Sequence, residues 1–331
     1  MSRGKRSWRA AGAGIAMVAA SAASLAGAAG PSAAATAPAS SHRTICDTPS
    51  STGPNPGAYV DGKRYWVEDD RFGTLDAKQC LTLTPHGRPA FRVSTSQARA
   101  GGNPVQAYPF IQYGCYWGWC TPGSTLPLRI SNIHSATSTW YTSEKSRGIW
   151  NAGYDLWLNS TPLADGHADR AEMMIWLNST SAHYQVGGPA GTRKVRVDGH
   201  SFYLTHWRTG QTTIPGGWEY IQYRLTGRPW HAKNLHIAAL LLDAARRHLI
   251  SKSWYLQGVL AGDEIWRGGQ GLATTWFSVN VVSKQASRRP KPVHGHKPGC
   301  KPHSRYCPHT STPPGPGYGQ PPVPLTMPFG P

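Results

Sequence analysis

The sequence has few charged residues: Asp, Glu, Lys and Arg make up 15% of its 331 residues, and only 16 residues are acidic. Beyond its first 37 residues it has no apolar run near the ~18 residues that a membrane-spanning helix needs. It also has no repeat of fixed period and no C-x-x-C pair, so a zinc site is the weaker alternative for its Cys- and His-rich C-terminal segment. We therefore expect a soluble mature protein.

The first 37 residues have the order of an export signal. Four basic residues come first, followed by small and apolar residues from Ala10 to about Ala29 and by an Ala-rich segment ending near Ala37. This order predicts secretion, with cleavage around Ala35 or Ala37. We expect an extracellular protein with no membrane contact after the signal has been removed.

The cysteines fit an exported protein, because thiols outside the cytoplasm usually form disulfides. Proximity in the sequence favours pairing Cys115 with Cys120 and Cys300 with Cys307. That choice leaves Cys46 to pair with Cys80.

The formal charge of +18 raises the question of nucleic-acid binding. The leader holds 4 of the 34 basic residues and the stretch from Lys284 onward holds 7, which leaves 23 basic against 16 acidic residues between them. This central part is only mildly basic and has no dense Lys/Arg stripe. We therefore expect no nucleic-acid partner.

The composition divides the chain into three parts: an export signal at 1–37, a folded domain at 43–283, and a Pro-rich, basic tail at 284–331. The tail has too few apolar residues to offset the entropy cost of ordering, so we predict that it is disordered. The central part has short alternating runs separated by Gly, Pro, Asn and Ser. This pattern predicts an all-β sandwich or barrel.

One segment has helical spacing instead. Asn234 to Ile250 is predicted to form a single helix on the outside of the sandwich, with Asn234 as its N-cap. Its apolar positions are Leu235, Ala238, Ala239, Leu242, Ala245 and Leu249.

Two strand-like runs carry acids beside tryptophan. In a strand, alternate side chains share a face, so Glu172 lies with Met174 and Trp176, opposite a face formed by Met173, Ile175 and Leu177. The run before it places Asp155 with Trp157 and Asn159. If the two strands pair, Asp155 can hydrogen-bond Glu172 and influence its protonation.

A third run places Glu264 on the same face as Trp266. Glycosidic bond cleavage needs one carboxyl group to protonate the leaving oxygen and a second to attack the sugar or activate water. Glu172 and Glu264 are candidates for these roles.

The motifs YDLWLN, AEMMIWLN and AGDEIWRGGQGLATTWFSV, together with the loop CYWGWC, resemble those of the glycoside hydrolase family 12 endoglucanases. The resemblance spans roughly Thr44 to Val282. It implies a jelly-roll sandwich of two antiparallel sheets, concanavalin A-like, with one packed helix and an open cleft. The implied activity is retaining hydrolysis of internal β-1,4 bonds by a monomer whose partner is a polysaccharide, the β-glucan substrate.

By motif position, the resemblance implies that Glu172 is the nucleophile, Glu264 the acid/base and Asp155 the assistant of the nucleophile. It implies no metal and no organic cofactor, and it supports the pairs Cys46–Cys80 and Cys115–Cys120. For retention, the two glutamate carboxyls are expected to lie ~5–5.5 Å apart. The residues expected to contact substrate are Asp70, Phe72, Trp157, Met174, Trp176 and Trp266.

Two departures affect the expected specificity. The family motif N-N-x-W-G is replaced by Asp69 to Gly73, in which Phe72 offers a smaller stacking surface than tryptophan. Asp263 stands where an aromatic residue is usual and, if close, would raise the pKa of Glu264. These departures leave two alternatives, a xyloglucan-specific hydrolase of the family and a non-catalytic glucan-binding sandwich. The basic tail leaves a third, an adhesive protein acting through that tail.

Overall fold

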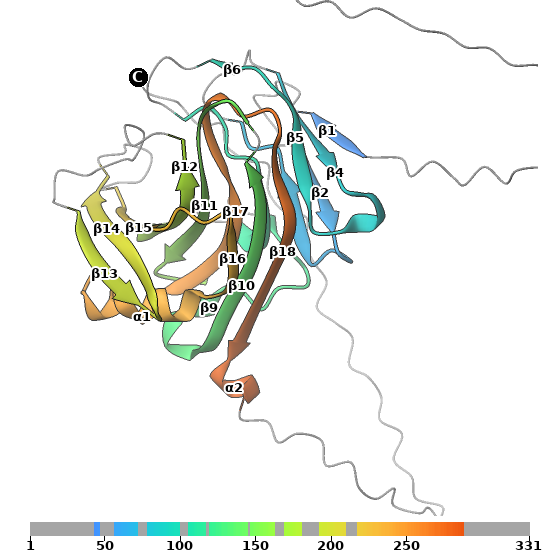
Figure 1. Ribbon diagram of the computed structural model, residues 1–331. Coiled ribbons are helices and arrows are strands. Elements are labelled where there is room, and N and C mark those ends of the chain that lie inside the picture. Colours follow the sequence, from blue (N-terminus) through green and yellow to red (C-terminus); the bar gives the residue numbers. More distant parts are fainter. Residues whose placement is uncertain are drawn as a thin grey trace, which may run out of the picture. The chain divides into compact units, whose positions relative to one another are not determined.

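The computed structural model describes residues 43–46, 56–71, 78–99, 105–116, 119–144, 146–162, 169–180, 192–209 and 217–287 (Figure 1). Within these ranges the chain forms two β-sheets packed as a sandwich, with one helix of several turns. The predicted all-β sandwich is confirmed.

The smaller sheet has six strands within the described ranges, all paired antiparallel. In spatial order they are β1 (Thr44–Cys46), β4 (Gln79–Leu83), β5 (Phe91–Ser96), β18 (Leu272–Ser283), β10 (Ile133–Glu144) and β16 (His231–His236). Short 3-10 turns at Pro85–Gly87 and Ile130–Asn132 precede β5 and β10.

The larger sheet has twelve strands in the described part of the chain. Its order is β13 (Arg193–Val197), β14 (His200–Arg208), β15 (Glu219–Leu225), β12 (Ala171–Ser179), β11 (Gly148–Asn159), β17 (Tyr255–Gly268), β7 (Phe110–Tyr116), β3 (Tyr65–Glu68) and β2 (Gly57–Val60), with β6 (Ala98–Arg99) and β9 (Leu128–Arg129) on β17 and β8 (Trp119–Cys120) on β7. The predicted sandwich of antiparallel sheets is present, with one parallel pair in this sheet, between β12 and β15.

The core lies between the sheets and follows the alternation of the strands. Met173, Ile175 and Leu177 of β12 are all 0% exposed and belong to this core, as predicted. Trp140 of the smaller sheet meets Tyr154 of the larger sheet edge-on, with ring centroids 5.1 Å apart. The opposite side chains of β12 therefore point out of the core.

The predicted helix is present, but it is shorter than predicted at both ends. It runs as α1 (Ile237–Arg246), whereas Asn234 lies in β16, where its backbone N–H donates to Thr139 Oγ1 of β10 at 3.1 Å. Leu242, placed on the predicted apolar face, is 42% exposed. The helix instead buries Ile237, Leu240, Leu241, Asp243 and Ala244. Pairing between β16 and β10 holds residues 231–236 extended and so delays the start of the helix.

Both disulfides implied by the family resemblance are present, Cys46–Cys80 and Cys115–Cys120. Cys300 and Cys307 lie outside the described residues. A short helix, α2 (Lys284–Ser287), follows β18, and Lys284 Nζ donates to Ser131 O at 2.6 Å. None of the helices in the described ranges is long and apolar enough to cross a membrane.

Candidate active site

Three carboxylates lie on the outer face of the larger sheet, on neighbouring strands. Trp157 of β11 pairs with Glu172 of β12, and Asn151 of β11 pairs with Glu264 of β17. Directly opposed residues in antiparallel strands present their side chains on the same face. Asp155, two residues before Trp157, shares that face. The fold thus brings the three predicted acids together on β12, β11 and β17.

Glu172 is partly exposed, and its Oε2 accepts a hydrogen bond of 2.9 Å from Trp218 Nε1. Desolvation raises the pKa of its carboxyl well above the usual range, the nearby charge of Glu264 raises it further, and the Trp218 hydrogen bond opposes both. Two ionised groups at this place would repel each other. The ionised form of Glu172 is therefore disfavoured while Glu264 is also ionised.

Asp155 is buried, with 5% of its surface exposed. Its Oδ2 accepts a hydrogen bond of 2.8 Å from Trp157 Nε1, and its Oδ1 has no hydrogen-bond partner in the described part of the chain. Burial and then the charge of Glu172 raise the pKa of Asp155 far above its ordinary value, although the indole opposes this. These surroundings favour the protonated form of Asp155.

Glu264 is partly exposed and is held by Asn151. Asn151 Nδ2 donates to Glu264 Oε2, and the Glu264 backbone N–H donates to Asn151 Oδ1 at 3.4 Å. Burial raises the pKa of Glu264 to about 7, against the effect of the Asn151 hydrogen bond. Asp263 is next in the chain but faces the other way, as alternation predicts, and is 1% exposed. A carboxyl group with this pKa can carry a proton near neutral pH.

The predicted stacking residues mostly form the floor below these acids. Trp176 and Trp266 are 0% exposed and cluster with Met174 and Tyr220. The Trp176 indole N–H and the Tyr220 hydroxyl both donate to Met174 Sδ, at 3.4 and 3.0 Å. Since neither indole has a free face, the structure does not support Trp176 and Trp266 as surfaces on which a sugar stacks.

Three other residues were predicted to contact the substrate: Trp157, Asp70 and Phe72. Trp157 keeps 8% exposure beside Glu172. Asp70 is 5% exposed, accepts a backbone hydrogen bond of 2.7 Å from Tyr108, and lies close enough for its charge to raise the pKa of Asp155. Phe72 lies outside the described residues.

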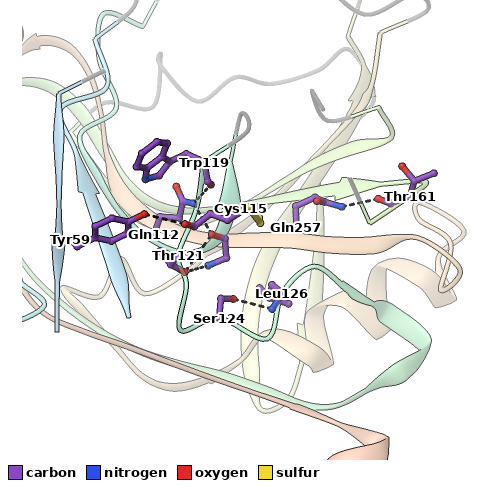
Figure 2. The surroundings of a disulfide bond; sticks show 11 residues. Tyr59, Gln112, Cys115, Trp119, Thr121, Ser124, Leu126, Thr161 and Gln257 are labelled. Atoms are coloured by element: carbon purple, nitrogen blue, oxygen red, sulfur yellow. Dashed lines mark hydrogen bonds between the residues drawn. A yellow bond between two sulfur atoms is a disulfide. The ribbon is translucent and has the colours of Figure 1, made fainter. Parts of the chain in front are cut away.

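The disulfide Cys115–Cys120 fastens a loop beside this face (Figure 2). Gln112 Nε2 donates to the carbonyls of Gly114 and Trp119, each at 2.8 Å. The ring of Tyr116 lies against Trp157, with centroids 6.1 Å apart. The loop therefore supports the indole that contacts Asp155.

The sequence alone did not identify Asn151 and Trp218, whose side chains donate hydrogen bonds to the two glutamates. Asn151 could have been found, because alternation along β11 places it on the same face as Asp155. Trp218 had no comparable signal, since it precedes β15 and is one of 14 tryptophans. In the part of the chain that the structure describes, no cluster of His, Cys, Asp and Glu could hold a metal ion.

Comparison with known proteins gives the chemistry of this face a context. Residues 63–282 match the sequence profile of glycosyl hydrolase family 12. Endoglucanase S of Pectobacterium parmentieri is 32% identical over 234 residues, covering 67% of this chain and 84% of that protein. The profile match includes all three carboxylates.

Solved structures share the fold. The endoglucanase cel12A from Rhodothermus marinus has a TM-score of 0.65 at 30% identity, covering 73% of this chain and 99% of that chain. The family 12 xyloglucanase from Bacillus licheniformis has a TM-score of 0.61 at 26% identity, covering 70% and 99%. Proteins named as an endoglucanase and as a xyloglucanase thus both resemble this chain.

Proposed function

The chain belongs to glycosyl hydrolase family 12 and is a glycoside hydrolase acting on β-glucans, and from this premise we propose that it is an endo-β-1,4-glucanase that retains the anomeric configuration. The main support is that Glu172 and Glu264 lie on one sheet face, both partly exposed, and that the charge of one raises the pKa of the other. A partly exposed pair of this kind can act on a sugar from solvent.

In the proposed reaction, ionised Glu172 attacks the anomeric carbon while protonated Glu264 gives its proton to the departing glycosidic oxygen. A covalent glycosyl-enzyme forms. Glu264 then takes a proton from the attacking water, and Glu172 leaves the sugar. Asp155 keeps its proton throughout and limits the negative charge beside Glu172.

Glutamine substitutions test the two roles. Glu264→Gln is expected to lower kcat for reducing-sugar release from a soluble β-1,4-glucan by about 10²–10⁴-fold, and Glu172→Gln by at least as much. Asp198→Asn, in the exposed turn between β13 and β14, is the control and should leave kcat unchanged. Unaltered hydrolysis by Glu172→Gln would refute the nucleophile assignment. Absence of hydrolysis by the wild-type protein would instead favour the glucan-binding alternative.

Retention has its own measurement. Proton NMR of the first product should show the β anomer before mutarotation. If the α anomer appears first, the reaction inverts, and Glu172 would be a base rather than a nucleophile.

Resemblance to the Bacillus licheniformis xyloglucanase makes a xyloglucan-specific hydrolase the second candidate. Comparing kcat/KM on carboxymethyl cellulose, mixed-linkage glucan and xyloglucan separates the two. We expect the unbranched glucans to be hydrolysed fastest. A preference for xyloglucan of tenfold or more would favour the alternative.

We also propose that the enzyme acts outside the cell. The export-like leader and the two disulfides support this. N-terminal sequencing of protein recovered from the culture medium should find a start near residue 36 or 38. Recovery of the active protein only from the cytoplasm would refute it.

A further inference from the structure

The side chain of Trp218 donates a hydrogen bond to the carboxylate of Glu172. It lies just before β15, is 9% exposed, and its Nε1 is 2.9 Å from Glu172 Oε2. An N–H donor on a carboxylate makes a charge-assisted hydrogen bond, which is stronger than one between neutral groups. It also occupies one of the two carboxylate oxygens and leaves Oε1 for the reacting sugar.

The position of this indole is fixed at both its backbone and its ring. Thr209, directly after β14, donates its backbone N–H to Trp218 O at 2.9 Å and accepts the Trp218 backbone N–H on Oγ1 at 3.0 Å. The ring packs against Trp157 with centroids 5.6 Å apart. A donor held in this way cannot easily follow the carboxylate into other orientations.

Two neighbouring indoles therefore each donate a hydrogen bond to one carboxylate. Trp157 Nε1 donates to Asp155 and Trp218 Nε1 donates to Glu172, while the two rings pack against each other. Other titratable groups near Glu172 come from several strands: Asp155 on β11, Glu264 on β17, Tyr220 on β15 and Tyr116 on β7. All of these are acids, so none of them stabilises a negative charge on Glu172 by charge attraction.

On the basis of the retaining mechanism proposed above, we propose that Trp218 is a positioning residue: it orients the Glu172 carboxylate for attack and favours its ionised form. The indole hydrogen bond lowers the pKa of Glu172 against burial and the Glu264 charge. Asp155, more deeply buried, is left as the group that keeps the proton.

Trp218→Phe tests this role, because it keeps an aromatic ring against Trp157 and removes only the N–H. A hydrogen bond to a charged group is worth enough for kcat to fall roughly ten- to a hundredfold on the acidic side of the optimum. The acidic limb of kcat/KM should move upward by about one pH unit, because Glu172 then becomes protonated at higher pH. Since Trp218 acts on the nucleophile, KM should change less than threefold.

Trp276→Phe is the matched control. It makes the same replacement on β18 of the other sheet, where the ring is 37% exposed, and should leave both kcat and the pH profile unchanged. If Trp218→Phe keeps the wild-type acidic limb and kcat, the positioning role is refuted.

A measurement on the wild-type protein is independent of whether Trp218→Phe folds. The indole N–H resonance of Trp218 should shift with the ionisation of Glu172, and this pH dependence should disappear in Glu172→Gln. A resonance that does not titrate in wild type would overturn the proposal. If Glu172→Gln retains hydrolysis, the proposed function itself fails. If Glu172→Gln is inactive but Trp218→Phe behaves as wild type, only the role of Trp218 fails.

Discussion

Each carboxylate of the site has its own hydrogen-bond donor. Trp218 donates to Glu172, Trp157 to Asp155, and Asn151 to Glu264. Burial raises the pKa of all three acids, so burial alone does not distinguish their roles. The degree of exposure does differ, since Asp155 is buried while both glutamates are partly exposed. Each amide or indole donor lowers the pKa of its own acid and so opposes the effect of burial.

Asn151→Ala tests this at Glu264. Removing the amide donor destabilises the ionised carboxylate, so the pKa of Glu264 should rise above about 7. Glu264 must be protonated to act as an acid, and activity is lost as the pH rises through its pKa. The basic limb of kcat/KM should therefore move to higher pH. The control is Asn280→Ala, on the exposed face of β18, which should leave the pH profile unchanged. If the basic limb of kcat/KM does not move in Asn151→Ala, the assignment of Glu264 as the acid is contradicted.

At the scale of elements, α1 is attached to the larger sheet by a buried carboxylate. Asp243 is 4% exposed, and Tyr223 of β15 donates to its Oδ2 at 2.8 Å. Arg247 Nε donates to the same oxygen at 2.7 Å. This arrangement fixes the helix to the strand that neighbours β12, and so supports the sheet that carries Glu172.

Asp243→Asn is expected to lower the free energy of unfolding by about 1–3 kcal/mol at pH 7, because it weakens hydrogen bonds to a buried charged group. Burial raises the pKa of Asp243, but the bonds from Arg247 and Tyr223 outweigh it, so the pKa is lowered overall. The contribution of the ionised Asp243 carboxylate to stability is thus fully present above the unfolded-state pKa of ~3.9. It is lost as the pH falls through the lower pKa of the folded state.

Urea unfolding at pH 7 and pH 3 measures this contribution. The difference between wild type and Asp243→Asn should shrink at pH 3. The control is Asp198→Asn, whose carboxylate pairs with His236 at 2.7 Å at an exposed position and should change stability by less than ~1 kcal/mol. An equal loss at both pH values would show that packing, not charge, attaches the helix.

At the scale of the whole domain, the two sheets are joined by large buried side chains. Trp140 of β10 is 0% exposed, meets Tyr154 of β11, and donates its Nε1 proton to Thr274 Oγ1 of β18 at 3.0 Å. The Tyr154 hydroxyl lies 3.1 Å from Ser138 Oγ, back on β10. These contacts hold the inner face of β11 while its outer face carries Asp155.

Trp140→Ala is expected to cost about 3–5 kcal/mol of unfolding free energy, because it leaves a large cavity between the sheets. Denaturant unfolding monitored by circular dichroism provides the value. Trp276→Ala is the control, and at a 37% exposed position it should stay within about 0.5 kcal/mol of wild type. Similar losses for both variants would mean that Trp140 is not a principal contact between the sheets.

Much of the site could be predicted from the sequence because strand alternation is local. A period of two places Glu172 away from Met173 and Ile175 whatever strand lies beside it, and the same rule places Asp263 on the face opposite Glu264. The assignment of roles came from the resemblance of the motifs to a family. The retaining chemistry and the contacts with substrate stay predictions.

The sequence by itself determined that the domain is rich in strands and on which strand faces the acids lie. It also determined which cysteines are close enough in the chain for their pairing to be favoured. Only the tertiary structure decided which strands are neighbours, how deeply Trp176 and Trp266 are buried, and that Trp218 reaches Glu172 across 46 residues. It also decided that residues 231–236 join a sheet before α1 begins. Side-chain direction within a strand is set by adjacent residues, whereas register, burial and helix limits depend on pairing between distant segments, whose energies local patterns do not contain.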